Sequence, residues 1–162
     1  MDGKRLALLR ELVPKAVRVA VLLNPSVRGE VETSLREVQE AARTMGLQVH
    51  VLQASTSREI DAAFASFVHE RPDVLYVAGD AFFNSRRVQI ANLAVRDRIP
   101  AAYGSRETVG VGGLMSYGTN PADGFHHVGV YTGQILKGAK PPDLPVVQSS
   151  TAAPIFMGIS WV

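Results

Sequence analysis

Short apolar runs alternate with longer stretches of helical periodicity along most of the chain. Residues 17–23 read Val-Arg-Val-Ala-Val-Leu-Leu, a β-branched run of the kind that is buried inside a parallel sheet. The run at residues 74–78, Val-Leu-Tyr-Val-Ala, has the same character. Shorter apolar runs predict further strands at residues 49–52, 99–103 and 113–116.

Helical stretches separate these strands. After the first strand, Leu35 and Val38 fall at helical spacing, and Gly46 suits the turn that follows a helix end. Thr56 and Glu59 form a capping-box pattern, in which each side chain satisfies a backbone amide of the other residue. The helices predicted in this way cover residues 4–12, 31–45, 56–68, 82–98 and 120–138.

Alternating strands and helices with short links imply right-handed βαβ units. The sequence therefore predicts an α/β fold with three layers, built on a doubly wound and mainly parallel sheet of about five strands. We expect one domain over residues 1–150. Residues 151–162 lack helical periodicity and are expected to form an atypical C-terminal tail.

Composition narrows the functional classes. A chain of 162 residues with 46% hydrophobic and 20% charged residues is typical of one globular domain. The formal charge is only +2, and the densest basic spot is Arg86–Arg87, so no nucleic-acid partner is indicated. There are no cysteines, which excludes disulfides and Cys-ligated zinc. No apolar run approaches the length of a membrane span, and residues 1–5 lack the features of a signal peptide, so the sequence by itself predicts a soluble chain.

The carboxyl ends of the predicted strands carry the candidate chemistry, because ligands of doubly wound sheets bind there. The candidate ligand-binding residues are Asn24, Ser26, Asp80, Phe82, Tyr103, Arg106 and Tyr117. An α-amino acid suits this set: Asp80 can pair with an ammonium group, and Arg106 or helix N-termini can bind a carboxylate. The aromatic rings can cover an apolar side chain, although Phe82 and its neighbour Phe83 also suit a hydrophobic core.

Catalytic chemistry is not indicated. Residues 24–29 lack the glycine pattern of a dinucleotide site, and Ala139 stands where a phosphate-binding loop requires lysine. His126 and His127 are adjacent on a helix and point in different directions, so they do not form a metal site together. We expect no catalytic residue, no metal and no cofactor.

Five stretches taken together carry a resemblance to a known family. They are residues 4–14, 18–25, 57–64, 79–87 and 113–118. In this order they resemble the ABC-transporter substrate-binding proteins whose better-known members take up tryptophan or tyrosine. The resemblance covers roughly residues 4–148, and the sequence departs from the family pattern after about Ser150.

The resemblance implies a type I periplasmic binding protein, in which two α/β lobes close on a small solute and deliver it to an ABC permease. This chain would correspond to the second lobe, without the first lobe or the signal sequence, and its location would be periplasmic. The family's cleft would then fall near Asn24, Asp80, Phe82, Tyr103 and Tyr117. A lone lobe is expected to bind its solute weakly, because enclosure between two lobes supplies most of the buried ligand surface.

Two other functions stay open at this point. The first is an effector-binding or sensory module of the same fold, which a DNA-binding domain would normally precede. The second is a flavodoxin-like cytosolic enzyme, which the missing phosphate loop disfavours.

The last predicted helix generates a testable expectation about assembly. Its apolar face would lose its usual cover without a first lobe, so we expect it to pack back onto the sheet or to form a homodimer. The residues of this face are Phe125, Val128, Ile135 and Leu136. A monodisperse monomer with this helix packed only on its own domain would contradict the dimer.

Overall fold

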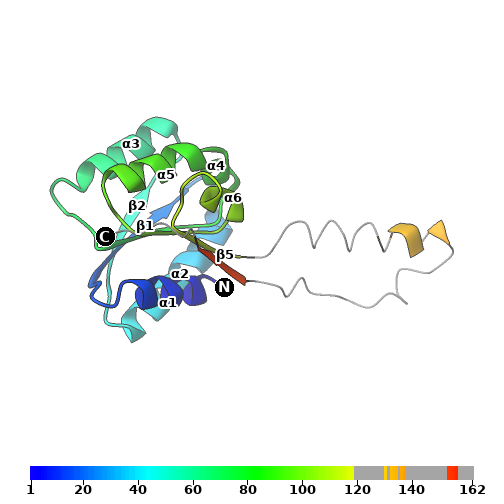
Figure 1. Ribbon diagram of the computed structural model, residues 1–162, viewed down its shortest axis with the longest axis horizontal. Coiled ribbons are helices and arrows are strands. Elements are labelled where there is room, and N and C mark those ends of the chain that lie inside the picture. Colours follow the sequence, from blue (N-terminus) through cyan, green and yellow to red (C-terminus); the bar gives the residue numbers. More distant parts are fainter. Residues whose placement is uncertain (119–129, 131, 135, 138–152, 157–162) are drawn as a thin grey trace. The chain divides into compact units, whose positions relative to one another are not determined.

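The predicted strands form one sheet in the computed structural model of the chain (Figure 1). The strands are β1 (Arg18–Leu23), β2 (Gln48–Gln53), β3 (Val74–Val77), β4 (Ala101–Tyr103), β5 (Met115–Gly118) and β6 (Ala153–Phe156). Their order across the sheet is β2-β1-β3-β4-β5-β6. The pairs β1–β2, β1–β3, β3–β4 and β4–β5 are all parallel, which confirms the predicted fold class.

The structure describes residues 1–118, 130, 132–134, 136–137 and 153–156. The chain divides into two compact units, Met1–Tyr117 with Pro154–Val162, and Gly118–Ala153. Residues 130, 132–134 and 136 are helical, within the range predicted for the last helix. Of the residues expected on its dimer-forming face, Phe125, Val128 and Ile135 lie outside the described residues, and Leu136 is exposed.

Helices cover both faces of the sheet. Figure 1 shows α1 (Asp2–Leu12) and α2 (Arg28–Thr44) on one face, and α3 (Ser57–Ser66) and α5 (Arg87–Arg96) on the other. The short α4 (Ala81–Ser85) follows β3, and the short α6 (Arg106–Val109) follows β4. This arrangement gives the three layers that the sequence predicted.

The main hydrophobic cluster lies between the sheet and the layer of α3 and α5. Among its members are Leu22, Ile60, Phe64, Leu75, Val77, Phe83, Ile90, Ile99 and Tyr103. All four residues of β3 are buried, as expected for a strand with a helix layer on each side. Each large apolar side chain that is buried in this way contributes about 1.5–3 kcal/mol.

The start of α3 matches its prediction closely. The Glu59 amide donates to Thr56 Oγ1 at 3.2 Å, and the Thr56 amide donates to Glu59 Oε2 at 3.1 Å. The capping box read from the sequence is therefore present.

The helix predicted over residues 82–98 is instead two helices that meet at Arg86. The backbone of Arg86 has φ −102° and ψ 13°, which interrupts the helical path. Ser85 Oγ donates to the carbonyl oxygen of Phe82 at 2.6 Å, a local bond that competes with helix continuation. Two short elements, α6 and β6, also form where the sequence predicted none.

Asp73 joins the starts of two neighbouring strands. Its Oδ2 accepts hydrogen bonds from the amides of Val17 and Arg18, both at 2.8 Å. These bonds, from Arg18 first, lower the pKa of the Asp73 carboxyl from its ordinary value. A carboxyl with a lowered pKa stabilises the fold above its unfolded-state pKa, and this stabilisation disappears as the pH falls through the folded-state pKa.

We therefore expect Asp73→Asn to lower the free energy of unfolding by about 1 kcal/mol at pH 7. The difference from the original chain should shrink as the pH falls below about 4, because the original carboxyl then becomes neutral as well. Urea unfolding at several pH values measures this. The matched control is Glu32→Gln on an exposed position of α2. A difference that stays constant with pH would show that the charge of Asp73 is unimportant.

Candidate functional site

The predicted site residues lie at or soon after the carboxyl ends of four strands. Parallel pairing places the ends of β1, β3, β4 and β5 at the carboxyl edge of the sheet. Asn24 and Ser26 follow β1, and Asp80 and Phe82 follow β3. Tyr103 ends β4, Arg106 begins α6, and Tyr117 is the third residue of β5.

Asn24 and Asp80 form the central polar contact of this edge. Asn24 is only 5% exposed, and its Nδ2 donates to both Asp80 oxygens at 3.2 Å. Asp80 also caps α4, because its Oδ1 accepts the Phe83 amide at 3.1 Å. On the other side, Asn24 Oδ1 accepts the Ser26 amide at 3.1 Å. The contact therefore fixes the position of a partly exposed carboxylate between the ends of two strands.

A small pocket adjoins this contact. It has a volume of about 20 Å³, and its lining includes Asn24, Ser34, Gly79 and Asp80. Ser34 Oγ is buried and has no hydrogen-bond partner among the described residues. A space of this size and polarity suits one water molecule. It is far too small for an amino acid, since ligand pockets usually measure about 300–1,000 Å³.

Phe82 and Phe83 differ in their surroundings, although they are neighbours in α4. Phe83 is buried in the hydrophobic cluster, whereas Phe82 packs against the cluster and stays partly exposed. The guanidinium carbon of Arg86 lies 6.0 Å from the centre of the Phe82 ring. Phe82 thus offers an apolar ring surface beside a cation at the carboxyl edge.

Tyr103 turns into the protein core. It is 3% exposed and belongs to the hydrophobic cluster, and burial raises the pKa of its hydroxyl. A Cβ at Gly113 would lie 2.8 Å from Tyr103 Cε2, so only glycine allows this close approach. The Tyr103 hydroxyl has no hydrogen-bond partner among the described residues. The Tyr103 ring therefore contributes to the core, and its hydroxyl is left without a partner among those residues.

Arg106 lies exposed at the start of α6. The neighbouring Ser105 hydroxyl donates to the Glu107 carboxylate, and this hydrogen bond lowers the pKa of Glu107. The loop therefore places a cation and a paired carboxylate at the edge. In the part of the chain that the structure describes, Arg106 forms no ion pair.

Tyr117 is bound by Arg5, a residue that was not among the predicted site residues. Its backbone oxygen accepts a 2.8 Å hydrogen bond from Arg5 Nε, and Lys4 Nζ lies 5.4 Å from the centre of its ring. Arg5 is 4% exposed and lies on the side of α1 that also buries Leu6 and Leu9. The sequence did contain a signal for its burial, because Arg5 precedes Leu9 by four positions and so lies on the same helix face.

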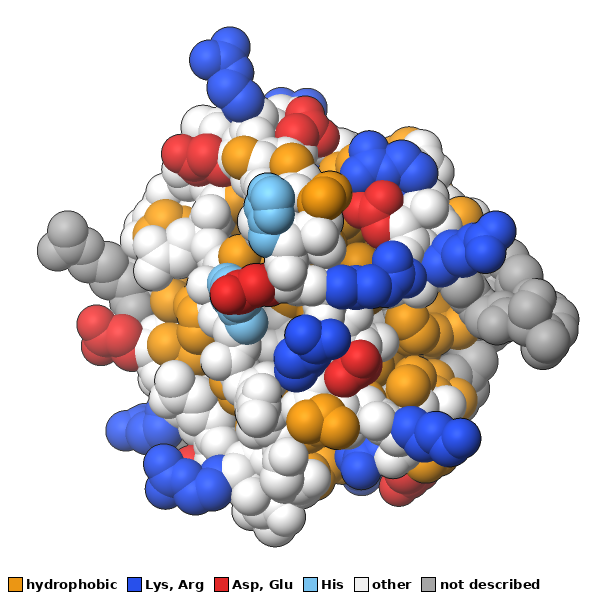
Figure 2. Space-filling model, turned by 90° about the vertical axis from the view of Figure 1, so that its left-hand side faces the viewer, with side chains coloured by type: hydrophobic (Ala, Val, Ile, Leu, Met, Phe, Trp, Pro, Cys, Tyr) orange, Lys and Arg blue, Asp and Glu red, His pale blue; other side chains and the backbone are white. Residues whose placement is uncertain are grey.

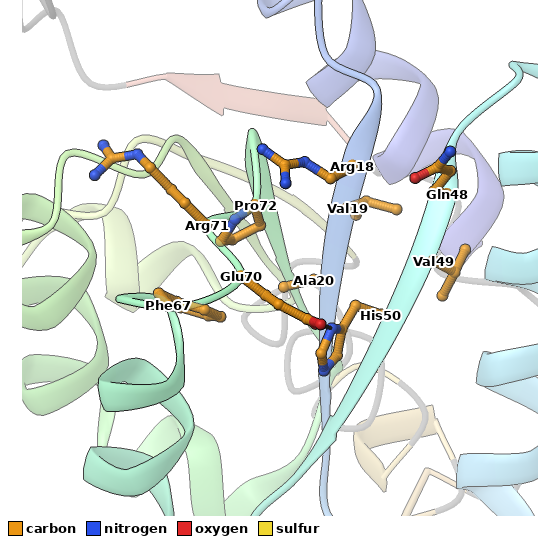
Figure 3. A pocket seen from close by; sticks show the side chains of 10 residues that line it. All are labelled: Arg18, Val19, Ala20, Gln48, Val49, His50, Phe67, Glu70, Arg71 and Pro72. Atoms are coloured by element: carbon orange, nitrogen blue, oxygen red, sulfur yellow. Dashed lines mark ion pairs between the residues drawn. The ribbon is translucent and has the colours of Figure 1, made fainter.

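The opposite, amino edge of the sheet has a larger hollow of about 310 Å³ (Figure 3). It opens where β1 and β2 begin, and Phe67, Ala20 and Pro72 contribute its apolar lining. His50 Nδ1 and Glu70 Oε2 form an exposed ion pair across it at 2.8 Å. Arg71 Nη2 donates to the carbonyl oxygen of Asp97 at 2.8 Å.

This hollow was not predicted from the sequence. Most of its charged groups are already paired with protein groups, so little is left to orient a ligand. His50 lies at the surface.

Charged side chains are mixed over the face that Figure 2 shows. Figure 2 shows one face on which cationic and anionic side chains are interspersed, with no continuous basic patch. Among the described residues, no group of three or more His, Asp or Glu side chains could hold a metal ion. None of the described helices is both long and apolar enough to cross a membrane.

The chain is a three-layer α/β unit with apolar and polar groups along the carboxyl edge of its sheet, the edge at which ligands of such sheets bind. The family model described as ABC transporter substrate binding protein matches residues 2–157. The chain therefore belongs to the family of ABC transporter substrate-binding proteins. The match continues into β6, beyond the stretch over which the sequence resemblance was drawn. This family is one of substrate-binding proteins and not of enzymes.

Solved structures show the same fold. An ABC domain from Streptococcus pneumonia, in complex with L-Trp, is 24% identical with a TM-score of 0.78, over 96% of this chain and 53% of that one. A conserved domain protein from Vibrio cholerae is 20% identical with a TM-score of 0.79, over 96% and 52%. The ligand-free, open substrate-binding protein CD0873 from Clostridium difficile is 28% identical with a TM-score of 0.67, over 94% and 51%. No curated protein matches the chain.

The chain thus spans about half the length of these solved relatives. The carboxyl edge is consequently compared with only part of each relative. A ligand bound by one of these full-length relatives is therefore not assigned to this chain by the likeness alone.

The Asn24–Asp80 contact gives a direct prediction. Asn24→Asp places a second carboxylate about 3 Å from the first, so like-charge repulsion should destabilise the fold by about 1–3 kcal/mol at pH 7. The repulsion raises the folded-state pKa of the pair. The lost stability should therefore return as the pH falls through that pKa.

The matched comparison is Asn24→Ala, which removes the donor without adding a charge. Its loss of stability should show no such recovery at low pH. Thermal unfolding of both variants between pH 4 and pH 7 checks this, and identical pH profiles would disprove a close contact between the two side chains.

Proposed function

We propose that this chain is a solute-binding lobe of an ABC importer and that it binds an amino acid at the carboxyl edge of its sheet. The observation that carries the proposal is the Asp80 carboxylate, held by Asn24 Nδ2 and by the Phe83 amide. A positioned carboxylate with remaining acceptor capacity suits an ammonium group.

The other groups of the edge suit the rest of an amino acid. Arg106 is exposed beside the end of β4 and can pair with a carboxylate. The partly exposed ring of Phe82 can cover an apolar side chain. Ser26 and Tyr117 are further proposed contacts of the same site, and Tyr103 supports it from the core.

The importer role rests on the family to which the chain belongs. In this role the lobe would hand its solute to an ABC permease, and its location would be periplasmic. The proposed lobe provides one side of a cleft, since the chain spans about half the length of its solved relatives. An effector-binding module of the same fold is the alternative, and no observation favours it.

Binding of three related compounds tests the ligand proposal. L-tryptophan carries both an ammonium group and a carboxylate, tryptamine lacks the carboxylate, and indole-3-propionate lacks the ammonium group. Ligand-observed NMR titrations should give a dissociation constant on the order of millimolar for L-tryptophan, and weaker binding for both analogues.

Asp80→Asn should weaken L-tryptophan binding about tenfold and leave indole-3-propionate unchanged, because only the ammonium contact is lost. Asp61→Asn, at an exposed position of α3, is the matched control and should bind like the original chain. Equal affinity for all three compounds, or an equal loss for all three in Asp80→Asn, would refute the assignment.

A further inference from the structure

Arg5 is the only Arg, Lys, Asp or Glu side chain among the buried polar residues that the structure describes. It lies in the first turns of α1, and 4% of its surface is exposed. Its guanidinium group lies over the Tyr76 ring, with 5.2 Å between the guanidinium carbon and the ring centre. Burying an arginine costs free energy unless hydrogen-bond acceptors surround its guanidinium group.

The contacts of Arg5 reach the ends of three strands. Nε donates to the Tyr117 carbonyl of β5 at 2.8 Å, and Nη1 approaches the Val77 carbonyl of β3 at 3.5 Å. A Cβ at Gly104, directly after β4, would lie 3.4 Å from Nη2 and 2.9 Å from the Gly79 Cα. The guanidinium group therefore lies beneath the carboxyl edge and against three neighbouring strands.

The remaining contacts join the group to Tyr76 of β3 and to Asp2 of its own helix. Nη1 donates to the Tyr76 hydroxyl at 2.8 Å, and that hydroxyl donates to Asp2 Oδ1 at 2.7 Å. Asp2 Oδ1 lies 3.6 Å from Arg5 Nη2. Burial is the main cause that raises the pKa of Tyr76, so its hydroxyl stays neutral and remains a donor. The first turn of α1 is thus tied to the sheet by a closed set of three side chains.

The place of these contacts connects them with the proposed ligand site. Val77 precedes Asp80 by three residues, and Tyr117 is the last residue of the first compact unit before the chain enters the unit Gly118–Ala153. A displaced Val77 carbonyl would move the strand end that carries Asp80. A released Tyr117 carbonyl would free the end of β5.

We propose that Arg5 is a positioning residue of the carboxyl edge: it fixes the ends of β3 and β5 relative to each other and so sets the positions of Asp80 and Tyr117. Its planar fork donates in several fixed directions at once, which a lysine ammonium cannot reproduce at this depth. The expected effect of Arg5 on ligand binding rests on the proposed function, whereas its structural role does not.

Hydrogen exchange of the variant Arg5→Lys tests the structural part. The lysine keeps the charge but cannot supply all three contacts, so amide exchange in β5 (Met115–Gly118) should rise by about tenfold or more. Exchange of the amides of β1 should stay unchanged. An equal rise in both strands would show general destabilisation and would overturn the inference, as would unchanged exchange in β5.

Arg10→Lys is the matched control on the same helix. Arg10 is half-buried and its Nη1 donates to the Val13 carbonyl at 3.1 Å, close to its own helix end and away from the strand ends. This variant should leave β5 exchange as it is in the original chain.

A measurement on the original chain covers the case in which Arg5→Lys does not fold. The Arg5 Nε–H should give a slowly exchanging ¹⁵N resonance, protected to about the same degree as the amides of β5. Rapid exchange of this resonance with water would overturn the inference without any variant.

L-tryptophan titration separates this inference from the proposed function. Arg5→Lys should weaken binding by about fivefold or more, while Arg10→Lys stays within about twofold. If the original chain does not bind L-tryptophan, the proposed function fails and exchange in β5 alone decides the role of Arg5. If the original chain binds and Arg5→Lys binds equally well, the positioning role fails and the proposed function stands.

Discussion

The buried guanidinium of Arg5 is the contact on which the carboxyl edge of this protein depends. It joins the first helix to the Tyr117 carbonyl of β5 and lies against the ends of β3 and β4. Backbone carbonyls and a tyrosine hydroxyl supply most of its acceptors, and the Asp2 carboxylate lies 3.6 Å from its Nη2. Removing one of these partners would leave a buried charge unsatisfied, and this costs more free energy than the intact contact contributes. Substitutions at Arg5 or its partners should therefore destabilise the edge.

The polar contact between Asn24 and Asp80 lies at the same edge of the sheet. Parallel pairing brings the ends of β1 and β3 together, and the Asn24 amide then holds the Asp80 carboxylate at 3.2 Å. The pocket beside them is only about 20 Å³, so this pocket by itself cannot enclose an amino acid. The chain spans about half the length of its solved relatives.

Periodic features were predictable from the sequence, whereas contacts between distant residues were not. Apolar runs gave β1 and β3, and the Thr56–Glu59 pattern gave the start of α3, because each depends on neighbours in the chain. The break at Arg86 is a local change of backbone angles beside the Ser85 hydrogen bond, and the periodicity of apolar residues does not reveal it. Arg5 meets Tyr117 across 112 positions, and Tyr103 packs in the core against Gly113, ten positions further along the chain.

The most direct test of the central claim is to map where L-tryptophan binds. Two-dimensional ¹H–¹⁵N NMR spectra of the labelled chain, recorded at millimolar L-tryptophan, report shifts for each backbone amide. The account predicts shifts at Asn24, Asp80, Phe82 and Tyr117, all at the carboxyl edge. Shifts confined to the hollow at the amino edge, around His50 and Phe67, or no shifts at all, would contradict it.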